Sequence, residues 1–186
     1  SCAILICYHF KTLKIMKDLK TVISNFAVDT NCGVLVKDDK IFVIDPDCEF
    51  FATDFDPCIR LEGKINPKDL GDGISTLVSY GRKLKNFGFD AQNIVLATAG
   101  CFDMLFLHKE FIKKLNKINS MVIPVENLSG NIETVVFDEN CEPKYVERSI
   151  KELEGEISEK CPGKIKFMLQ DEFDKLWDDS TKPYED

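Results

Sequence analysis

The chain has 186 residues, of which 44% are hydrophobic and 30% are charged, a composition typical of one globular domain with a sizeable core. Its formal net charge of -8 and its pI near 4.9 disfavour broad contacts with nucleic acids or acidic membranes, because like charges repel. Lysine and arginine are spread along the chain, so no basic stripe offsets this repulsion.

Cysteine is frequent in this chain, which bears on the redox compartment. The cysteines are Cys2, Cys7, Cys32, Cys48, Cys58, Cys101, Cys141 and Cys161. They form no CxxC pairs of the zinc-binding kind, and a chain of this length does not need disulfides to be stable. Their even number leaves disulfides open as an alternative, but since they lie in apolar or strand-like runs, we favour free buried thiols in a cytoplasmic protein.

The first apolar run, residues 3–8, is too short to cross a membrane as a helix. It also lacks the basic residues and the small-residue cleavage site of a signal peptide. We expect this run to form a first or edge strand. A second β-prone run covers residues 21–23, and residues 25–31 are loop-like.

A β-hairpin is predicted next. Residues 32–36 and 41–44 are apolar, β-branched runs joined by a short polar turn, and the second run ends at Asp45-Pro46. After an irregular stretch over residues 47–66, a helix is expected to begin at Asn66-Pro67. Asparagine is a favoured N-cap there, and proline is favoured at the first helical position.

That helix is expected to end at Gly88, and a strongly β-prone strand follows at residues 94–98. Beyond it, helices are predicted at residues 107–117, 145–160 and 171–177, and strands at residues 120–123, 132–137 and 164–169. We expect Pro124 to end one strand, Pro162-Gly163 to end the second of these helices, and Asp171 to cap the last one.

The order of these elements predicts an α/β or α+β fold, with helices covering a mixed sheet. Neither an internal repeat nor a low-complexity tract divides the chain. We therefore predict a single domain over residues 1–177, followed by an acidic tail over residues 178–186 that frays.

The loop after the strand at residues 94–98 is the most informative stretch, because α/β folds place their chemistry at the carboxyl ends of buried strands. Two segments leading to it resemble the metallo-β-lactamase fold family: the hairpin of residues 31–46, which ends near Asp45, and residues 89–98. The resemblance implies an αββα sandwich of mixed sheets flanked by helices. It also implies a metal site at this loop.

Most of the family's T-H-x-H-x-D-H metal motif is replaced in this chain. Thr98 and Asp103 match the motif, whereas Ala99, Cys101 and Met104 stand in place of its three histidines. What remains of the site loop can shape the turn at the end of the strand, but it offers too few ligands for an ordinary hydrolytic metal site.

Two further positions follow from the same resemblance. Asp138 is a candidate for the aspartate that bridges the metals of the family. Cys161-Pro162-Gly163 occurs where many members carry proline and glycine before a histidine, so Lys164 replaces that histidine.

A hydrolytic zinc site needs three or more ligands and an open position for an activated water, and imidazole is the commonest ligand. The chain has only His9 and His108. We expect His108 to face solvent from a short helix and His9 to lie at the surface. The sequence therefore favours a protein without catalytic residues and without a bound metal or other cofactor.

The function expected from these observations is that of a pseudoenzyme, which binds a protein partner or a small ligand in the vacated cleft. We expect no contact with nucleic acid and none with a membrane. A homodimer is compatible with the sequence.

Two alternatives remain open at this point. The first is a metal-dependent hydrolase with an unorthodox zinc site, whose residual ligands would come from Asp45, Cys101, Asp103, His108 and Asp138. The second is a nucleotide-binding domain like those of actin-like ATPases and exopolyphosphatases. Residues 29–33 resemble the phosphate loop of that family.

Three side chains at the predicted site each have a structural interpretation that we favour. Cys101 is a candidate nucleophile, but it has no evident base and suits a buried, inert thiol. Asp103 suits a residue that accepts backbone N–H groups and holds its turn. Asp45 suits the same role at the end of its strand.

Overall fold

A five-stranded sheet forms the centre of the molecule. The computed structural model describes residues 2–52, 72–99, 109–140 and 142–183. The five strands are β1 (Gly33–Lys37), β2 (Lys40–Asp45), β3 (Ile94–Thr98), β4 (Ser120–Val125) and β7 (Ile165–Leu169). Their order is β1-β2-β3-β4-β7, with β1 antiparallel to β2 and all other neighbours parallel. The predicted α/β fold with a mixed sheet is therefore confirmed.

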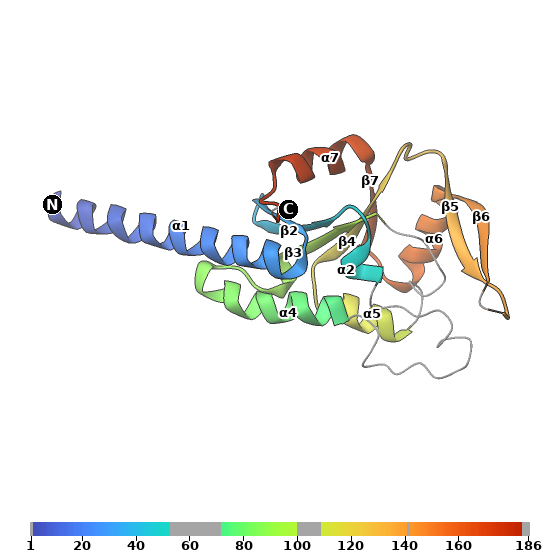
Figure 1. The fold of residues 1–186 in the computed structure, drawn as a ribbon, viewed down its shortest axis with the longest axis horizontal. Helices are drawn as coiled ribbons and strands as arrows, with labels where there is room; N and C mark the ends of the chain where they lie inside the picture. Colours follow the sequence, from blue (N-terminus) through green and yellow to red (C-terminus); the bar gives the residue numbers. More distant parts are fainter. Residues whose placement is uncertain (1, 53–71, 100–108, 141, 184–186) are drawn as a thin grey trace.

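Helices lie on both faces of this sheet (Figure 1). The longer helices are α1 (Cys2–Thr30), α4 (Asp72–Leu84), α5 (Lys109–Leu115), α6 (Ile150–Lys160) and α7 (Gln170–Asp179). Short helical turns are α2 (Glu49–Ala52), η1 (Lys85–Phe87) and η2 (Ala91–Asn93).

Side chains that alternate along β2 and β3 enter two separate cores, because successive residues of a strand point to opposite faces. Val43 and Leu96 pack with buried residues of α1, α4, α5 and α6. Ile44 and Ala97 pack against α7 on the other face. Both strands are therefore buried on both sides, which explains why their sequences are nearly continuous runs of apolar residues.

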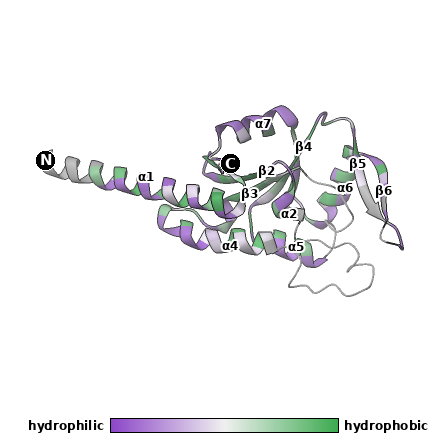
Figure 2. Cartoon of the chain, viewed as in Figure 1, coloured by the Kyte–Doolittle hydropathy of each residue, from purple (hydrophilic) through white to green (hydrophobic). Residues whose placement is uncertain are grey.

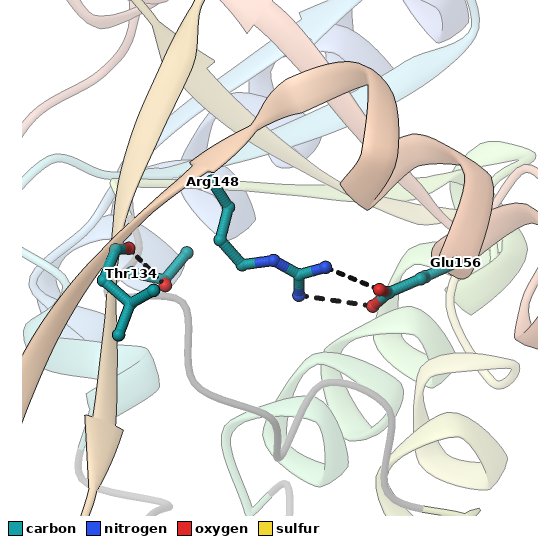
Figure 3. Close-up of polar contacts among 4 residues, drawn as sticks. Thr134, Arg148 and Glu156 are labelled. Atoms are coloured by element: carbon teal, nitrogen blue, oxygen red, sulfur yellow. Dashed lines mark hydrogen bonds and ion pairs between the residues drawn. The ribbon is translucent and has the colours of Figure 1, made fainter.

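A second, two-stranded sheet pairs β5 (Asn131–Phe137) with β6 (Pro143–Ser149). An ion pair ties it to α6: the Arg148 guanidinium contacts both carboxylate oxygens of Glu156, at 2.5 and 3.3 Å (Figure 3). This guanidinium holds the pKa of Glu156 below its usual range. Within the sheet, the buried Thr134 hydroxyl donates to the Val146 carbonyl at 2.7 Å.

The predicted hairpin is confirmed as β1 and β2. Its two turn residues, Asp38 and Asp39, have φ angles of 51° and 60°. Positive φ at both central positions is the signature of the turn type whose twist matches that of paired strands. Aspartate tolerates this conformation better than most residues, so the polar turn of the sequence suits the geometry.

The predicted helix stop at Gly88 is also confirmed. Gly88 has a φ of 87°, and its N–H donates to the Lys85 carbonyl at 3.1 Å. This left-handed conformation costs glycine little and ends a helix by redirecting the chain. The start predicted at Asn66-Pro67 lies outside the described residues.

The N-terminal prediction was wrong. Residues 3–8 and 21–23 are not strands, and residues 25–30 are not a loop, because all of them belong to α1. The buried residues of its C-terminal half are Ile23, Phe26, Ala27 and Thr30. Their spacing of three or four residues is the period of one helix face, and packing of that face decides the conformation of a β-prone run.

A second correction concerns residues 145–149, which were predicted to begin a helix. They form the end of β6, and the helix starts only at Ile150. Seven cross-strand pairs with β5 override the helical spacing that Val146 shares with Ile150.

Pro124 does not end β4 as predicted, since the strand runs on to Val125. The pairing of β4 with β3 stops at Val122, so beyond this residue β4 pairs only with β7. A residue without an N–H group is tolerated where one side of a strand has no partner.

The predicted acidic tail is ordered in its first part. Residues 178 and 179 belong to α7, and Thr181 exchanges two backbone hydrogen bonds of 3.0 Å with Val34. A Cβ atom on Gly33 would lie 2.4 Å from Ser180 Oγ and 2.9 Å from the Trp177 ring, so the C-terminal segment packs directly on β1. Asp171 lies in the first turn of α7, but the N-cap is Leu169, without a side-chain hydrogen bond.

One contact between α1 and α4 responds to pH. The Tyr80 ring stacks on the Phe26 ring with centroids 3.9 Å apart, and the Tyr80 hydroxyl donates to Asp29 Oδ2. Burial, followed by this hydrogen bond and by the charge of Asp29, raises the pKa of Tyr80 from 10 to about 12. Deprotonation of Tyr80 therefore disfavours the folded state.

Replacing Tyr80 tests this contact. Between pH 10 and about 12 the folded protein keeps the Tyr80 proton while the unfolded chain loses it, so this contribution to stability is present below pH 10 and is lost as the pH rises. In urea unfolding over this range, we expect a shallower loss of stability for Tyr80→Phe than for the wild type. The exposed control Tyr145→Phe should behave like the wild type. Equal slopes for all three proteins would contradict the assignment.

Candidate functional site

The candidate site lies at the carboxyl ends of β2 and β3. Asp45 and Thr98 are the last residues of these parallel strands and are register partners. By strand alternation both side chains point to the face covered by α1, α4 and α5, the face that also receives Val43 and Leu96. Neighbouring strands lie about 4.8 Å apart, so the two side chains are close neighbours.

Asp45 connects the two loops that leave these strands. Its carbonyl oxygen accepts the N–H of Ala99 at 3.3 Å and the N–H of Cys48 at 3.4 Å. Its carboxylate oxygen Oδ1 accepts the N–H of Glu49 at 3.2 Å, at the start of α2. Only 3% of the residue is exposed. The favoured structural role of Asp45, in which it binds local backbone groups, is therefore observed.

Thr98, in contrast to Asp45, has a buried side-chain oxygen without a hydrogen bond among the described residues. It is fully buried, with 0% of the residue exposed, and its hydroxyl oxygen has no hydrogen-bond partner in the part of the chain that the structure describes. A buried hydroxyl without a partner costs free energy, because it has left water without replacing the lost hydrogen bonds. Such a group is exceptional and points to a ligand, a water or a functional constraint.

Cys32 approaches the same region from the start of β1. It is fully buried, and its thiol donates to the Thr30 carbonyl at 3.5 Å. Burial, and secondarily the charge of Asp45, raises the pKa of Cys32 to about 12. At neutral pH this thiol is protonated, so Cys32 is unsuited to act as a nucleophile or to bind a metal as a thiolate.

The thiols whose surroundings the structure describes are buried or half-buried. Cys32 and Cys161 are buried and Cys48 is half-buried, and none of these three forms a disulfide. Burial also raises the pKa of Cys161. Burial is thus confirmed for Cys32 and Cys161 and only in part for Cys48, and the redox state of the cysteines stays a prediction.

The predicted site loop is described only at its beginning. Thr98 ends β3, and Ala99 donates its N–H to Asp45 as described above. Cys101, Asp103, Met104 and His108 lie outside the described residues. Their proposed roles as replaced or residual ligands therefore stay predictions.

Asp138 lies in the other sheet, at the turn that joins β5 to β6. Its carboxylate oxygen Oδ1 accepts the N–H groups of Asn140 at 2.8 Å and Glu142 at 3.0 Å. These bonds close the turn, which is a common use of aspartate. Asp138 thus has a structural role at a turn, while Asp45 ends a strand of the five-stranded sheet.

Lys164 lies at the amino ends of the parallel strands, whereas Asp45 and Thr98 lie at their carboxyl ends. It precedes β7, and its ammonium donates to the carbonyls of Ile118 and Asn119 at 2.7 and 3.1 Å, just before β4 begins. Since β4 and β7 run parallel to β3, these positions mark the amino edge of the sheet. Burial lowers the pKa of Lys164. The implied position of Lys164, at the metal site in place of a histidine, is therefore wrong.

Within residues 2–52, 72–99, 109–140 and 142–183, no group of three or more histidine, cysteine, aspartate or glutamate side chains could hold a metal ion. In the same part of the chain, no helix is long and apolar enough to span a membrane. The chemistry that the described residues offer at the carboxyl edge is hydrogen bonding by one hydroxyl and one carboxylate.

Two features of this site, the proximity of Cys32 to Asp45 and the unpartnered Thr98 hydroxyl, were not predicted from the sequence. The proximity of Cys32 to Asp45 follows from the pairing of β1 with β2, and the polar turn could have indicated it. The unpartnered state of Thr98 had no signal, because it depends on which groups surround the hydroxyl.

Comparisons of the chain with protein-family models, with curated proteins and with solved structures find no match. The metallo-β-lactamase resemblance therefore rests on the quoted residues alone and stays a prediction.

Replacing Thr98 by valine tests whether its hydroxyl lacks a partner. Valine has nearly the same shape without the polar atom, so we expect the free energy of unfolding, measured in urea, to rise by about 1 kcal/mol. The matched control is Thr134→Val, because the buried Thr134 hydroxyl has a partner in Val146. There we expect a loss of about 1 kcal/mol. A Thr98→Val protein less stable than the wild type would show that some group satisfies the hydroxyl.

Proposed function

We propose that this chain is a non-catalytic binding domain, which holds a small polar ligand at the carboxyl edge of β2 and β3. The observation that carries the proposal is the fully buried Thr98 hydroxyl, which has no partner among the described residues and lies beside the buried Asp45. A ligand that hydrogen-bonds this hydroxyl would remove the cost of its burial. The ligand would bind more tightly because its hydrogen bond relieves an unfavourable free energy of burial that is present in the unliganded protein.

The position of the pair supports the same proposal. Ligands of α/β proteins bind outside the carboxyl ends of parallel strands, where the loops diverge. The Asp45 carbonyl accepts N–H groups from both diverging loops, so it links the two loops where they leave the strands.

The residue types indicate the ligand chemistry. The Thr98 hydroxyl both donates and accepts, and the Asp45 carboxylate only accepts. A ligand with adjacent N–H or O–H donors and an acceptor, such as an amide or a polyol, complements this pair. Because both side chains are buried, the ligand is a small molecule or the tip of a side chain and not an extended surface.

The absence of catalysis is proposed from the sequence of the site loop. Three positions that would be histidines in the motif it resembles are Ala99, Cys101 and Met104. Alanine offers no ligand atom and methionine is not among the usual zinc ligands, so of these three positions Cys101 alone could bind zinc, which needs three or more protein ligands. The proposed protein therefore resembles a metallo-β-lactamase domain that has lost its metal and retains a binding role.

Two measurements on the purified chain test this function. Elemental analysis should find no stoichiometric zinc, and one or two tightly bound zinc ions per chain would contradict the proposal. Two-dimensional amide NMR with acetamide, ethanolamine and glycerol as probes should show shifts at Asp45, Thr98 and Ala99 for at least one probe.

Variants make the NMR result specific. We expect Thr98→Val to abolish the shifts at the carboxyl edge, while the matched variant Thr134→Val keeps them. Shifts that survive in Thr98→Val, or no shift with any of the three probes, would overturn the proposed site.

A further inference from the structure

A groove lies between α1 and the outer edge of β1, which is an end strand of the five-stranded sheet. Its volume is about 490 Å³. The apolar residues that line it are Met16, Leu19 and Ile23 of α1 and Val34, Leu35 and Val36 of β1. Since three consecutive residues of β1 line the groove, it follows the edge of the sheet and not one of its faces. Figure 1 shows the C-terminal half of α1 beside the sheet, and Figure 2 shows hydrophobic and hydrophilic segments alternating along this helix.

Backbone groups of β1 point toward this edge. Val34 exchanges two backbone hydrogen bonds of 3.0 Å with Thr181, so the N–H and C=O groups of Val34 point away from β2. In an antiparallel pair every second residue directs its backbone groups the same way, so those of Val36 also point away from β2. Among the described residues, no hydrogen bond to these two groups of Val36 is found. The edge therefore offers one donor and one acceptor at the groove.

The C-terminal segment does not pair with Val36 as it pairs with Val34. An antiparallel strand that places Thr181 opposite Val34 would place residue 179 opposite Val36, two residues further along each strand. Asp179 is the last residue of α7 and is therefore helical. The extended part of the segment thus begins too late to reach Val36, whose backbone groups stay open to the groove.

We propose that this groove is a second binding site, which takes an extended peptide as an additional, antiparallel strand opposite Val36. One peptide residue exchanges two hydrogen bonds with Val36, in the way that Thr181 does with Val34. Residues paired across two strands direct their side chains to the same face, and Val36 packs on the core that includes residues of α1. The side chain of this peptide residue therefore meets Leu19 and Ile23, which favours an apolar residue there.

The backbone groups of Val36 favour a peptide over other occupants of the groove. An acyl chain offers no hydrogen bond to them, and a helix of a second copy has its own N–H and C=O groups bonded internally. An extended peptide presents one donor and one acceptor to the residue with which it pairs. Charge does not select the ligand, because Lys20 and Asp179 both line the groove. Affinity is therefore expected from the backbone hydrogen bonds, and preference among peptides from the apolar side chain.

Amide NMR titration of the whole chain with the blocked peptide acetyl-KTLTK-amide tests this proposal. The peptide should cause saturable shifts at Val36 and at Ile23, on the two sides of the groove. A second peptide carries a methyl group on the backbone nitrogen of its leucine, which removes the donor and keeps the side chain. It should bind about 10-fold more weakly or worse, because the hydrogen bond to the Val36 carbonyl is lost. A third peptide, with serine in place of leucine, should also bind more weakly.

Variants of the protein make the result specific for the groove. Val36→Pro removes the donor of the edge, at a position where an edge strand tolerates proline, and should abolish the shifts. Met16→Glu places a charge at the groove and should weaken binding by about 10-fold, while its 54% exposure keeps the fold intact. Val28→Glu is the matched control: Val28 is 60% exposed on the same helix and does not line the groove, so this variant should bind like the wild type.

Several results would contradict the proposal. One is the absence of shifts at Val36 with the first peptide, and another is equal binding of the methylated peptide. Shifts at Val36 on concentrating the protein alone would show that a second copy occupies the edge. An equal response to decanoate would show that the groove takes any apolar chain. The comparison of peptides needs no change in the protein, so it decides the question even if Val36→Pro fails to fold.

Discussion

The parallel pairing of β2 with β3 is the interaction on which the rest of the structure depends. It aligns five residues of one strand with five of the other, from Ile41 opposite Ile94 to Asp45 opposite Thr98. Parallel pairing requires a crossover, and here α4 makes it on the face that also carries α1. The same register that fills the two cores with aliphatic side chains ends in two polar residues. Core packing and the candidate site are therefore consequences of one alignment.

Much of this arrangement could be predicted from the sequence, and the reason lies in burial. The hairpin, β3 and the start of β4 are short apolar runs bounded by turn residues, a pattern that few structures other than strands satisfy. The prediction for the N-terminal segment was wrong because residues 3–8 are all apolar, so their sequence shows no helical spacing of apolar and polar residues. The prediction for residues 145–149 was wrong for the opposite reason. Val146 and Ile150 do have a helical spacing, but pairing with β5 overrides it.

The site was predictable only in part. Asp45 could be placed at the end of a strand and given a backbone-binding role from sequence, and the structure bears out that role. The state of Thr98 could not be predicted, because an unpartnered hydroxyl is a property of its surroundings and not of local sequence. Lys164 shows the limit of motif transfer: a residue aligned by its neighbours in sequence lies at the other edge of the sheet, where it binds the carbonyls of Ile118 and Asn119.

The backbone bridge between Thr181 and Val34 has a consequence for how the chain is made. An edge strand with unpaired N–H and C=O groups invites pairing with other chains, and proteins cover such edges. Here Thr181 pairs with one residue of the edge, Val34, and this partial cover comes from the C-terminal segment, whereas β1 follows the first helix. During synthesis β1 is thus complete long before its cover exists. The nascent chain passes through a period in which this edge is exposed, and that period ends only when the C-terminal segment arrives.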